Sequence, residues 1–149
     1  MYSGFSGLAG GQYFDLTYEN KKISKNKIIN IQNNKTGKLF SFCCECAGII
    51  KGQDLKKRTV LKKIGQDIGL LFQVTDDLID FKGDSKIVGK PTKRDKKKGK
   101  PTLVNLLGYK QTLSFANKLK NNITKKIKKY GIKSKDLLQS VEFILSREF

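Results

Sequence analysis

The chain has 149 residues, of which 38% are hydrophobic, so its length and composition fit one domain with a modest core. Its 31 Lys and Arg against 13 Asp and Glu give a net charge of +18, which predicts attraction to phosphates, nucleic acid or anionic membranes. The alternative is that most of the lysines only cover solvent-exposed helix faces. The lack of histidine excludes serine–histidine catalysis, and without a membrane-spanning run or a leader-like start we expect a cytoplasmic protein.

Positions 1–16 contain many glycines and scattered apolar residues. We therefore expect residue 1 to lie partway along a helical element. From about residue 26 to residue 50, apolar side chains recur at helical spacing, which predicts one continuous helix. Its apolar positions are Ile28, Ile31, Leu39, Phe42, Cys46 and Ile49. We interpret the cysteines of this stretch (Cys43, Cys44 and Cys46) as reduced and mostly buried, because their odd number and close spacing do not suit a zinc site.

A second helical stripe starts near Leu55. Asp54 precedes it in the position of a helix cap, and Gly83 follows it where a helix can end. The apolar members of this stripe are Leu61, Ile64, Ile68, Leu71, Phe72, Leu78 and Ile79. This spacing predicts a long helix with one buried face.

The last third of the chain predicts further helices after a lysine-rich loop. Pro101 suits the first turn of a helix that contains "TLVNLLG"; a lysine-rich helix follows to about Tyr130, where Gly131 closes it. A final amphipathic helix is expected over residues 134–147. Because no stretch alternates in the manner of a strand, we predict an all-α fold of packed antiparallel helices across residues 1–149.

Three carboxylates interrupt the apolar run "GLLFQVTDDLIDFKGD". On a helix, Asp76 and Asp80 share one face, Asp77 lies beside them, and Gln73 sits one turn earlier. Like charges so placed repel, and Mg²⁺ is the hard cation that would compensate them with carboxylate, water and phosphate oxygens. The alternative is that these are ordinary exposed carboxylates on the polar side of an amphipathic helix.

The segment "GDSKIVGKPTKRDKKKGKPT" directly follows these carboxylates. Its cationic residues include Lys90, Lys93, Arg94, Lys96, Lys97, Lys98 and Lys100. Metal-binding carboxylates beside a glycine-containing cationic loop suit a diphosphate, because metal and lysines can bind different oxygens of it. Taken singly, such lysines would be ordinary surface residues.

The ordered motifs "GGQYFDL", "NKTGKLF", "FQVTDDLIDFKGD" and "GKPTKRDKKKGKPT" resemble the C-terminal half of trans-type polyprenyl diphosphate synthases, the farnesyl and geranylgeranyl diphosphate synthase family. This resemblance implies part of the helical isoprenoid synthase fold. It also implies an Mg²⁺-dependent prenyltransferase that condenses isopentenyl diphosphate with an allylic diphosphate through an allylic carbocation.

The resemblance also implies roles for individual residues. Asp76, Asp77 and Asp80 correspond to the second of two Asp-rich motifs that bind Mg²⁺, and Asp76 to its most direct ligand. Lys35 and Lys90 correspond to lysines that contact the allylic diphosphate.

Six further residues correspond to polar groups of the family's active site. Thr36 and Gln73 match the groups beside the developing cation, and Gln12 with Asp15 matches a pair that supports substrate binding. The loop residues that match the acid and base of the closing segment are Asp95 and Lys100. Without the motif context, Thr36 would simply bond a helix carbonyl, and Gln12 with Asp15 would be a pair at a helix end.

Members of the resembled family are about twice as long, and the first Asp-rich motif belongs to their N-terminal half. The sequence therefore leads us to expect a C-terminal portion with an incomplete site, acting as a homodimer or with a complementing N-terminal half. The competing hypothesis is a non-catalytic partner that associates with another synthase chain. Nucleic-acid binding is not expected, since no aromatic residue interrupts the basic run from Lys93 to Lys100.

Overall fold

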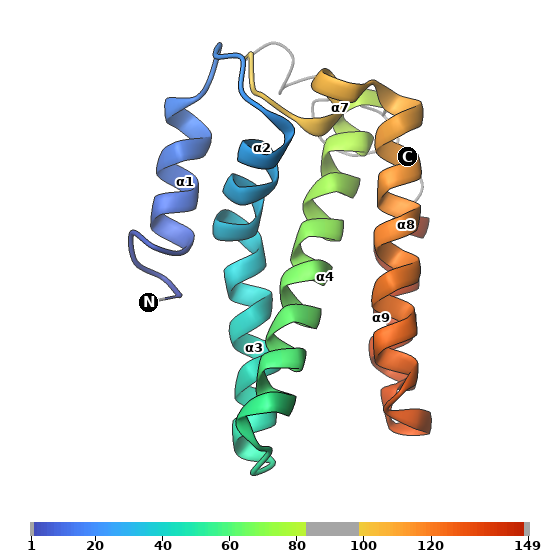
Figure 1. Ribbon diagram of the computed structural model, residues 1–149. Helices are drawn as coiled ribbons and strands as arrows, with labels where there is room; N and C mark the ends of the chain where they lie inside the picture. The colour runs from blue at the N-terminus through green and yellow to red at the C-terminus, as the bar shows by residue number, and fades with distance from the viewer. Residues whose placement is uncertain (1, 83–98, 148–149) are drawn as a thin grey trace.

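Helices make up the regular structure of the computed structural model, which describes residues 2–82 and 99–147. They are α1 (Leu8–Thr17), α2 (Lys25–Gln32), the π-helix η1 (Asn33–Gly37), α3 (Lys38–Ile50), α4 (Leu55–Lys82), α7 (Leu103–Leu107), α8 (Tyr109–Lys128), the 3₁₀-helix η2 (Gly131–Ser134) and α9 (Lys135–Ser146). The long helices run alternately up and down the bundle (Figure 1), which confirms the predicted antiparallel all-α fold. None of the described helices combines the length and apolar character needed to cross a bilayer.

The stretch predicted as one helix from residue 26 to residue 50 is helical without a break, and its middle is the π-helical segment η1, which the sequence pattern did not predict. The backbones of neighbouring elements pack closely around η1. A Cβ atom on Gly11 would stand 2.2 Å from the backbone nitrogen of Lys35, so α1 crosses η1 backbone against backbone. Gly37 and Gly69 allow a similar approach of α4, where a Cβ on Gly69 would lie 2.7 Å from the Gly37 Cα atom. The glycines thus bring three elements together at η1.

The core of the described structure lies along α4, as its sequence periodicity predicted. Asp54 caps this helix, since its Oδ1 accepts a hydrogen bond from the backbone N–H of Lys57 at 2.8 Å. The buried side of α4 packs against α3, α8 and α9. Its most buried apolar residues are Ile64, Ile68, Leu71, Val74 and Leu78.

The C-terminal helices begin and end close to their predicted positions, with one correction. Pro101 does not open a helix, because the Thr102 hydroxyl accepts a hydrogen bond from Asn105 N–H at 3.1 Å and makes Thr102 the N-cap of α7. Gly131 has a φ of 69° beyond the end of α8, as expected of a helix-terminating glycine. The last helix, α9, covers almost all of the predicted range.

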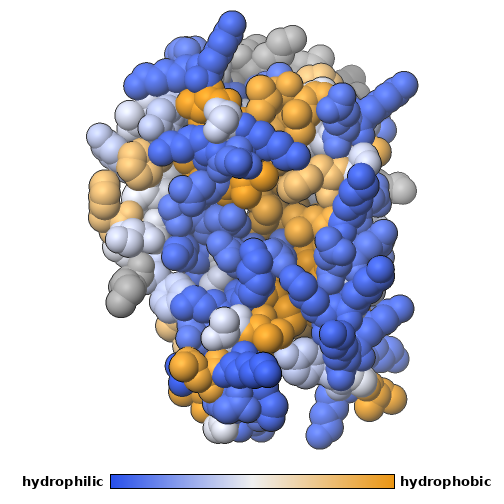
Figure 2. Space-filling model, in the orientation of Figure 1, coloured by the Kyte–Doolittle hydropathy of each residue, from blue (hydrophilic) through white to orange (hydrophobic). Residues whose placement is uncertain are grey.

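The face of α3 that packs on α4 is lined by small residues, and the sequence stripe misidentified it. Gly37 at the end of η1 and Ser41 and Gly48 of α3 are buried against α4, whereas Leu39 and Phe42 remain 51% and 45% exposed. The cysteines share this outcome: Cys43 is exposed and Cys44 and Cys46 are half-buried, so their predicted burial was wrong. Figure 2 shows a lengthwise strip of hydrophobic side chains on the side in view, between hydrophilic ones. The described chain therefore presents considerable apolar surface.

Candidate functional site

Asp15 of α1 lies between two lysines that arrive from different parts of the chain. Its Oδ2 atom is 2.5 Å from Lys35 Nζ on η1 and 3.6 Å from Lys100 Nζ, which precedes α7. The side chains of Asp15 and Lys100 are only 14% and 16% exposed. One partly buried carboxylate thus holds two cationic groups in place, an arrangement suited to binding an anion.

Thr36 and Gln73 meet on the neighbouring side of η1. The Thr36 hydroxyl donates a hydrogen bond to Gln73 Oε1 at 3.2 Å, and this contact joins η1 to α4. Gln73 Nε2 in turn lies 3.5 Å from Asp77 Oδ1, a long contact along α4. Residues from two of the predicted motifs therefore converge, because the glycine contacts described above bring η1 onto α4.

Asp77 differs from the two neighbouring aspartates because it is buried. Its side chain retains 4% exposure, and Oδ2 accepts a hydrogen bond of 2.7 Å from Nε2 of Gln32, which is 6% exposed. Gln32 was not among the residues predicted from the sequence. Its position next to Ile31, on the buried side of a helix, is the feature that could have indicated a need for a polar partner. Its other amide atom, Oε1, is buried without a hydrogen-bond partner within the described residues.

Asp76 contacts Arg147, a residue that no sequence pattern singled out. Its Oδ1 atom lies 3.0 Å from a terminal nitrogen of Arg147, just beyond α9. The guanidinium carbon of Arg147 also sits 4.5 Å from the ring centroid of Phe72. Asp80 is half-buried one turn further along α4. Within residues 2–82 and 99–147, no three acidic or cysteine side chains gather as a metal-binding group.

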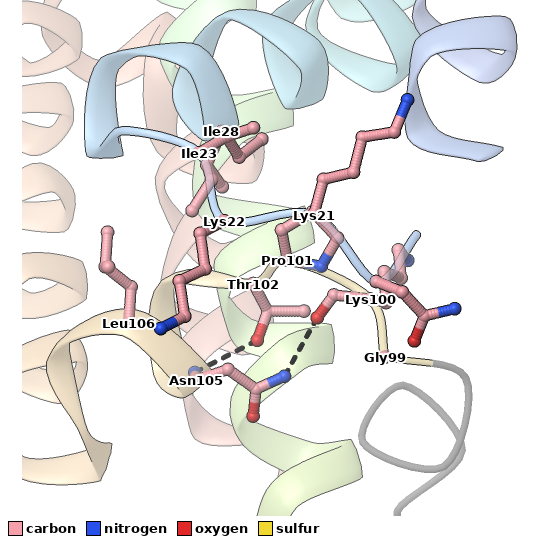
Figure 3. Close-up of a pocket in the computed structure, with 11 residues that line it drawn as sticks. Lys21, Lys22, Ile23, Ile28, Gly99, Lys100, Pro101, Thr102, Asn105 and Leu106 are labelled. Carbon is pink, nitrogen blue, oxygen red and sulfur yellow. Dashed lines mark hydrogen bonds between the residues drawn. The ribbon is translucent and has the colours of Figure 1, made fainter. Parts of the chain in front are cut away.

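Two cavities adjoin these residues. A small one is bordered by Asp15, Gln32, Lys35, Gln73 and Lys100. A larger one, of about 440 Å³, shares Lys100 and Thr102 with it and also has Lys21 and Lys22 in its lining (Figure 3). The backbone of Lys100 is fixed here, since its carbonyl accepts a hydrogen bond of 2.9 Å from Asn105 Nδ2.

Not every predicted site residue joins this group. Gln12 is exposed on α1 and makes no side-chain hydrogen bond in the described part of the chain, so its supporting role stays a prediction. Lys90 and Asp95 lie outside the described residues. The structure therefore brings together Asp15, Lys35, Thr36, Gln73 and Lys100 next to the three aspartates of α4.

Comparison with known proteins identifies the family. The polyprenyl synthetase family model matches residues 3–141. Farnesyl diphosphate synthase of Escherichia coli is 33% identical over 135 residues, which cover 90% of this chain and 45% of that protein. The corresponding synthase of Haemophilus influenzae is 32% identical over 148 residues, covering 98% and 50%. The chain thus spans about half the length of the curated relatives it matches.

Solved structures show the same helical architecture. An FPP/GFPP synthase from Zymomonas mobilis superposes with a TM-score of 0.81 and 34% identity, over 96% of this chain and 47% of that one. A geranyltransferase from Helicobacter pylori, complexed with magnesium and isoprenyl diphosphate, gives a TM-score of 0.79 and 29% identity, over 95% and 46%. The helical fold and the converging motifs agree with the family match. The chain belongs to the polyprenyl synthetase family.

Proposed function

We propose that this chain supplies the diphosphate-binding part of a prenyltransferase that condenses isopentenyl diphosphate with an allylic diphosphate. The observation that carries the proposal is the convergence of Asp15, Lys35, Thr36, Gln73 and Lys100, contributed by α1, η1, α4 and the segment before α7. Relatives named farnesyl and geranylgeranyl diphosphate synthases support the same chemistry.

In this proposal the two lysines bind the leaving group. Lys35 and Lys100 donate to diphosphate oxygens, and Asp15 keeps both ammonium groups in position before the substrate arrives. The Thr36 and Gln73 oxygens direct their dipoles towards the allylic carbon as its bond to the diphosphate oxygen breaks. The double bond of isopentenyl diphosphate then forms the new carbon–carbon bond, and loss of a proton gives the longer diphosphate. Lys90 and Gln12 would add further substrate contacts.

Asp76 and Asp80 are suited to hold Mg²⁺, because they offer hard carboxylate oxygens one helical turn apart on α4. Asp76 already forms an ion pair with the guanidinium group of Arg147. When bound, Mg²⁺ would neutralise diphosphate charge and make it a better leaving group. Asp77 keeps its predicted place in the Asp-rich motif, but we assign it the task of fixing α4 through Gln32, since its carboxylate is buried.

The remaining metal ligands would come from the diphosphate, from water and from a first Asp-rich motif. The 149 residues contain only one such motif, so we infer that the other is supplied by a longer form of the chain, a complementing half or a partner subunit. We therefore expect little turnover from these residues alone, and expect turnover once an N-terminal half is provided.

Binding of inorganic pyrophosphate to the chain, measured by titration calorimetry with and without Mg²⁺, tests this assignment directly. Asp76→Asn is expected to weaken the Mg²⁺-dependent binding at least about tenfold, since it removes a charged ligand. The matched control is Asp136→Asn, at an exposed position of α9. Binding that ignores Mg²⁺, or that responds equally to both variants, would contradict the assignment.

A second candidate function is a non-catalytic partner of another synthase chain. The exposed apolar face of α3, with Leu39, Phe42 and Ile49 about half exposed, favours stable association with a second protein. Size-exclusion chromatography with a full-length farnesyl diphosphate synthase distinguishes the two. A complex without gain of turnover would support the partner role, and Mg²⁺-dependent pyrophosphate binding by the chain would support the catalytic one.

A further inference from the structure

A separate cavity of about 620 Å³ opens at the end of the bundle away from α7, where the α3–α4 and α8–α9 turns lie (Figure 1). Its apolar lining includes Leu61, Ile64, Ile127 and Leu137. Ile64 and Ile127 are each 1% exposed, so they form part of the packed core. The volume falls within the range of about 300 to 1,000 Å³ that small-molecule pockets usually have.

The polar part of this lining is cationic. Lys51, Lys57 and Lys133 line the cavity, and none of its lining residues is acidic. Lys51 and Lys133 form no ion pair with any described residue. Lys57 Nζ lies 3.6 Å from Asp54 Oδ2, but both side chains are largely exposed, so this pair neutralises the lysine only weakly.

A neighbouring cavity shows that lysines do not line every hollow of this basic protein. It has a volume of about 750 Å³, lies between α3 and α9, and shares Cys44 and Leu137 with the first. Its lining is also apolar, but it contains Asp136 and no lysine. The combination of apolar wall and cationic opening therefore distinguishes the first cavity.

We propose that the cavity lined by Lys51, Lys57 and Lys133 binds an amphipathic anion, with an unbranched or prenyl chain against Leu61, Ile64 and Ile127 and its anionic end at the lysines. Lysine stems can cover the chain while their ammonium groups meet the anion. The position is distinct from the diphosphate site, because Leu61 and Asp76 are separated by about 22 Å along α4 at the usual helical rise. The proposal therefore does not depend on the proposed function.

Displacement of the fluorescent fatty acid cis-parinarate from the 149-residue chain measures this binding. Laurate is expected to compete about tenfold better than dodecanol in dilute buffer, since only laurate can pair with the lysines. The difference should shrink at about 1 M salt, where charges are screened within a few ångströms. Equal competition by both compounds at low salt would overturn the proposal without any variant being made.

Two pairs of variants locate the site. Ala47→Trp fills the cavity from an exposed position and should weaken laurate binding at least tenfold, whereas Ser140→Trp fills only the neighbouring cavity and should change it less than twofold. The double change Lys51→Glu and Lys133→Glu should weaken binding about tenfold. Lys118→Glu, on an exposed part of α8, is its charge control and should have a small effect.

Circular dichroism confirms that each variant is folded before binding is compared. If Ser140→Trp impairs binding as much as Ala47→Trp, or if Lys118→Glu matches the double lysine variant, the cavity is not the binding site. Retention of Mg²⁺-dependent pyrophosphate binding by Ala47→Trp separates this result from any failure of the diphosphate site.

Discussion

Replacing Gln32 with leucine should destabilise the protein by about 2 to 3 kcal/mol, because it removes a hydrogen bond from a buried carboxylate. The Gln32 amide donates to Asp77 Oδ2 over 2.7 Å, and the two side chains are 6% and 4% exposed. A hydrogen bond to a charged group contributes about 1.5 to 3 kcal/mol, and the carboxylate left behind cannot turn to water at this depth. Leucine has nearly the same volume, so little cavity cost adds to this figure.

Urea unfolding followed by far-ultraviolet circular dichroism at neutral pH measures the loss, which corresponds to a drop of roughly 5 to 10 °C in Tm for a chain of this length. The double variant with Asp77→Leu should recover part of the stability, because it no longer leaves a buried carboxylate without Gln32 but also removes the contact with Gln73. Gln139→Leu, at an exposed position of α9, is the matched control. A loss below about 0.5 kcal/mol in Gln32→Leu would refute the reasoning, because it would mean that the hydrogen bond contributes no more than an exposed polar contact.

Two further substitutions and one chemical-labelling experiment test other features of the structure. Thr102→Ala should cost about 1 kcal/mol in urea unfolding, since it removes the buried cap of α7, and an unchanged midpoint would contradict the capping role. Arg147→Gln should strengthen Mg²⁺ binding up to about fivefold in calorimetry, because the guanidinium no longer competes for Asp76; weaker binding would show that the arginine assists the metal instead. Iodoacetamide should modify the exposed Cys43 faster than Cys44, because burial raises the pKa of the Cys44 thiol and reduces its thiolate fraction, and peptide mass analysis would show the order.

The sequence predicted the helices well because helix periodicity and end signals are local. Asp54 and Gly131 act at helix ends as expected, and α4 buries the stripe that its spacing indicated. The resemblance also grouped Lys35 and Gln73, which do lie near one another across the η1–α4 contact. The helix features follow from short stretches of chain, whereas the grouping of Lys35 with Gln73 came only from the family resemblance.

Contacts between distant residues could not be predicted in the same way. Gln32 and Asp77 are 45 positions apart, and Arg147 reaches Asp76 from the far end of the chain, so neither partner changes the local pattern of the other. The packed face of α3 was misread for another reason. Periodicity marks large apolar residues as buried. The end of η1 and α3 instead pack through Gly37, Ser41 and Gly48, whose small size permits a close helix contact but carries no hydrophobic signal.

The close approach of Gly37 and Gly69 determines whether the side chains of Thr36 and Gln73 can meet. With no side chain between the two backbones, any residue larger than glycine at position 69 would force α4 away from η1. Thr36 precedes Gly37 in the chain and Gln73 lies one helical turn after Gly69, so the hydrogen bond between their side chains depends on this close approach. The meeting of these two motifs therefore depends on glycine at two positions, which no apolar side chain could replace without moving the helices apart.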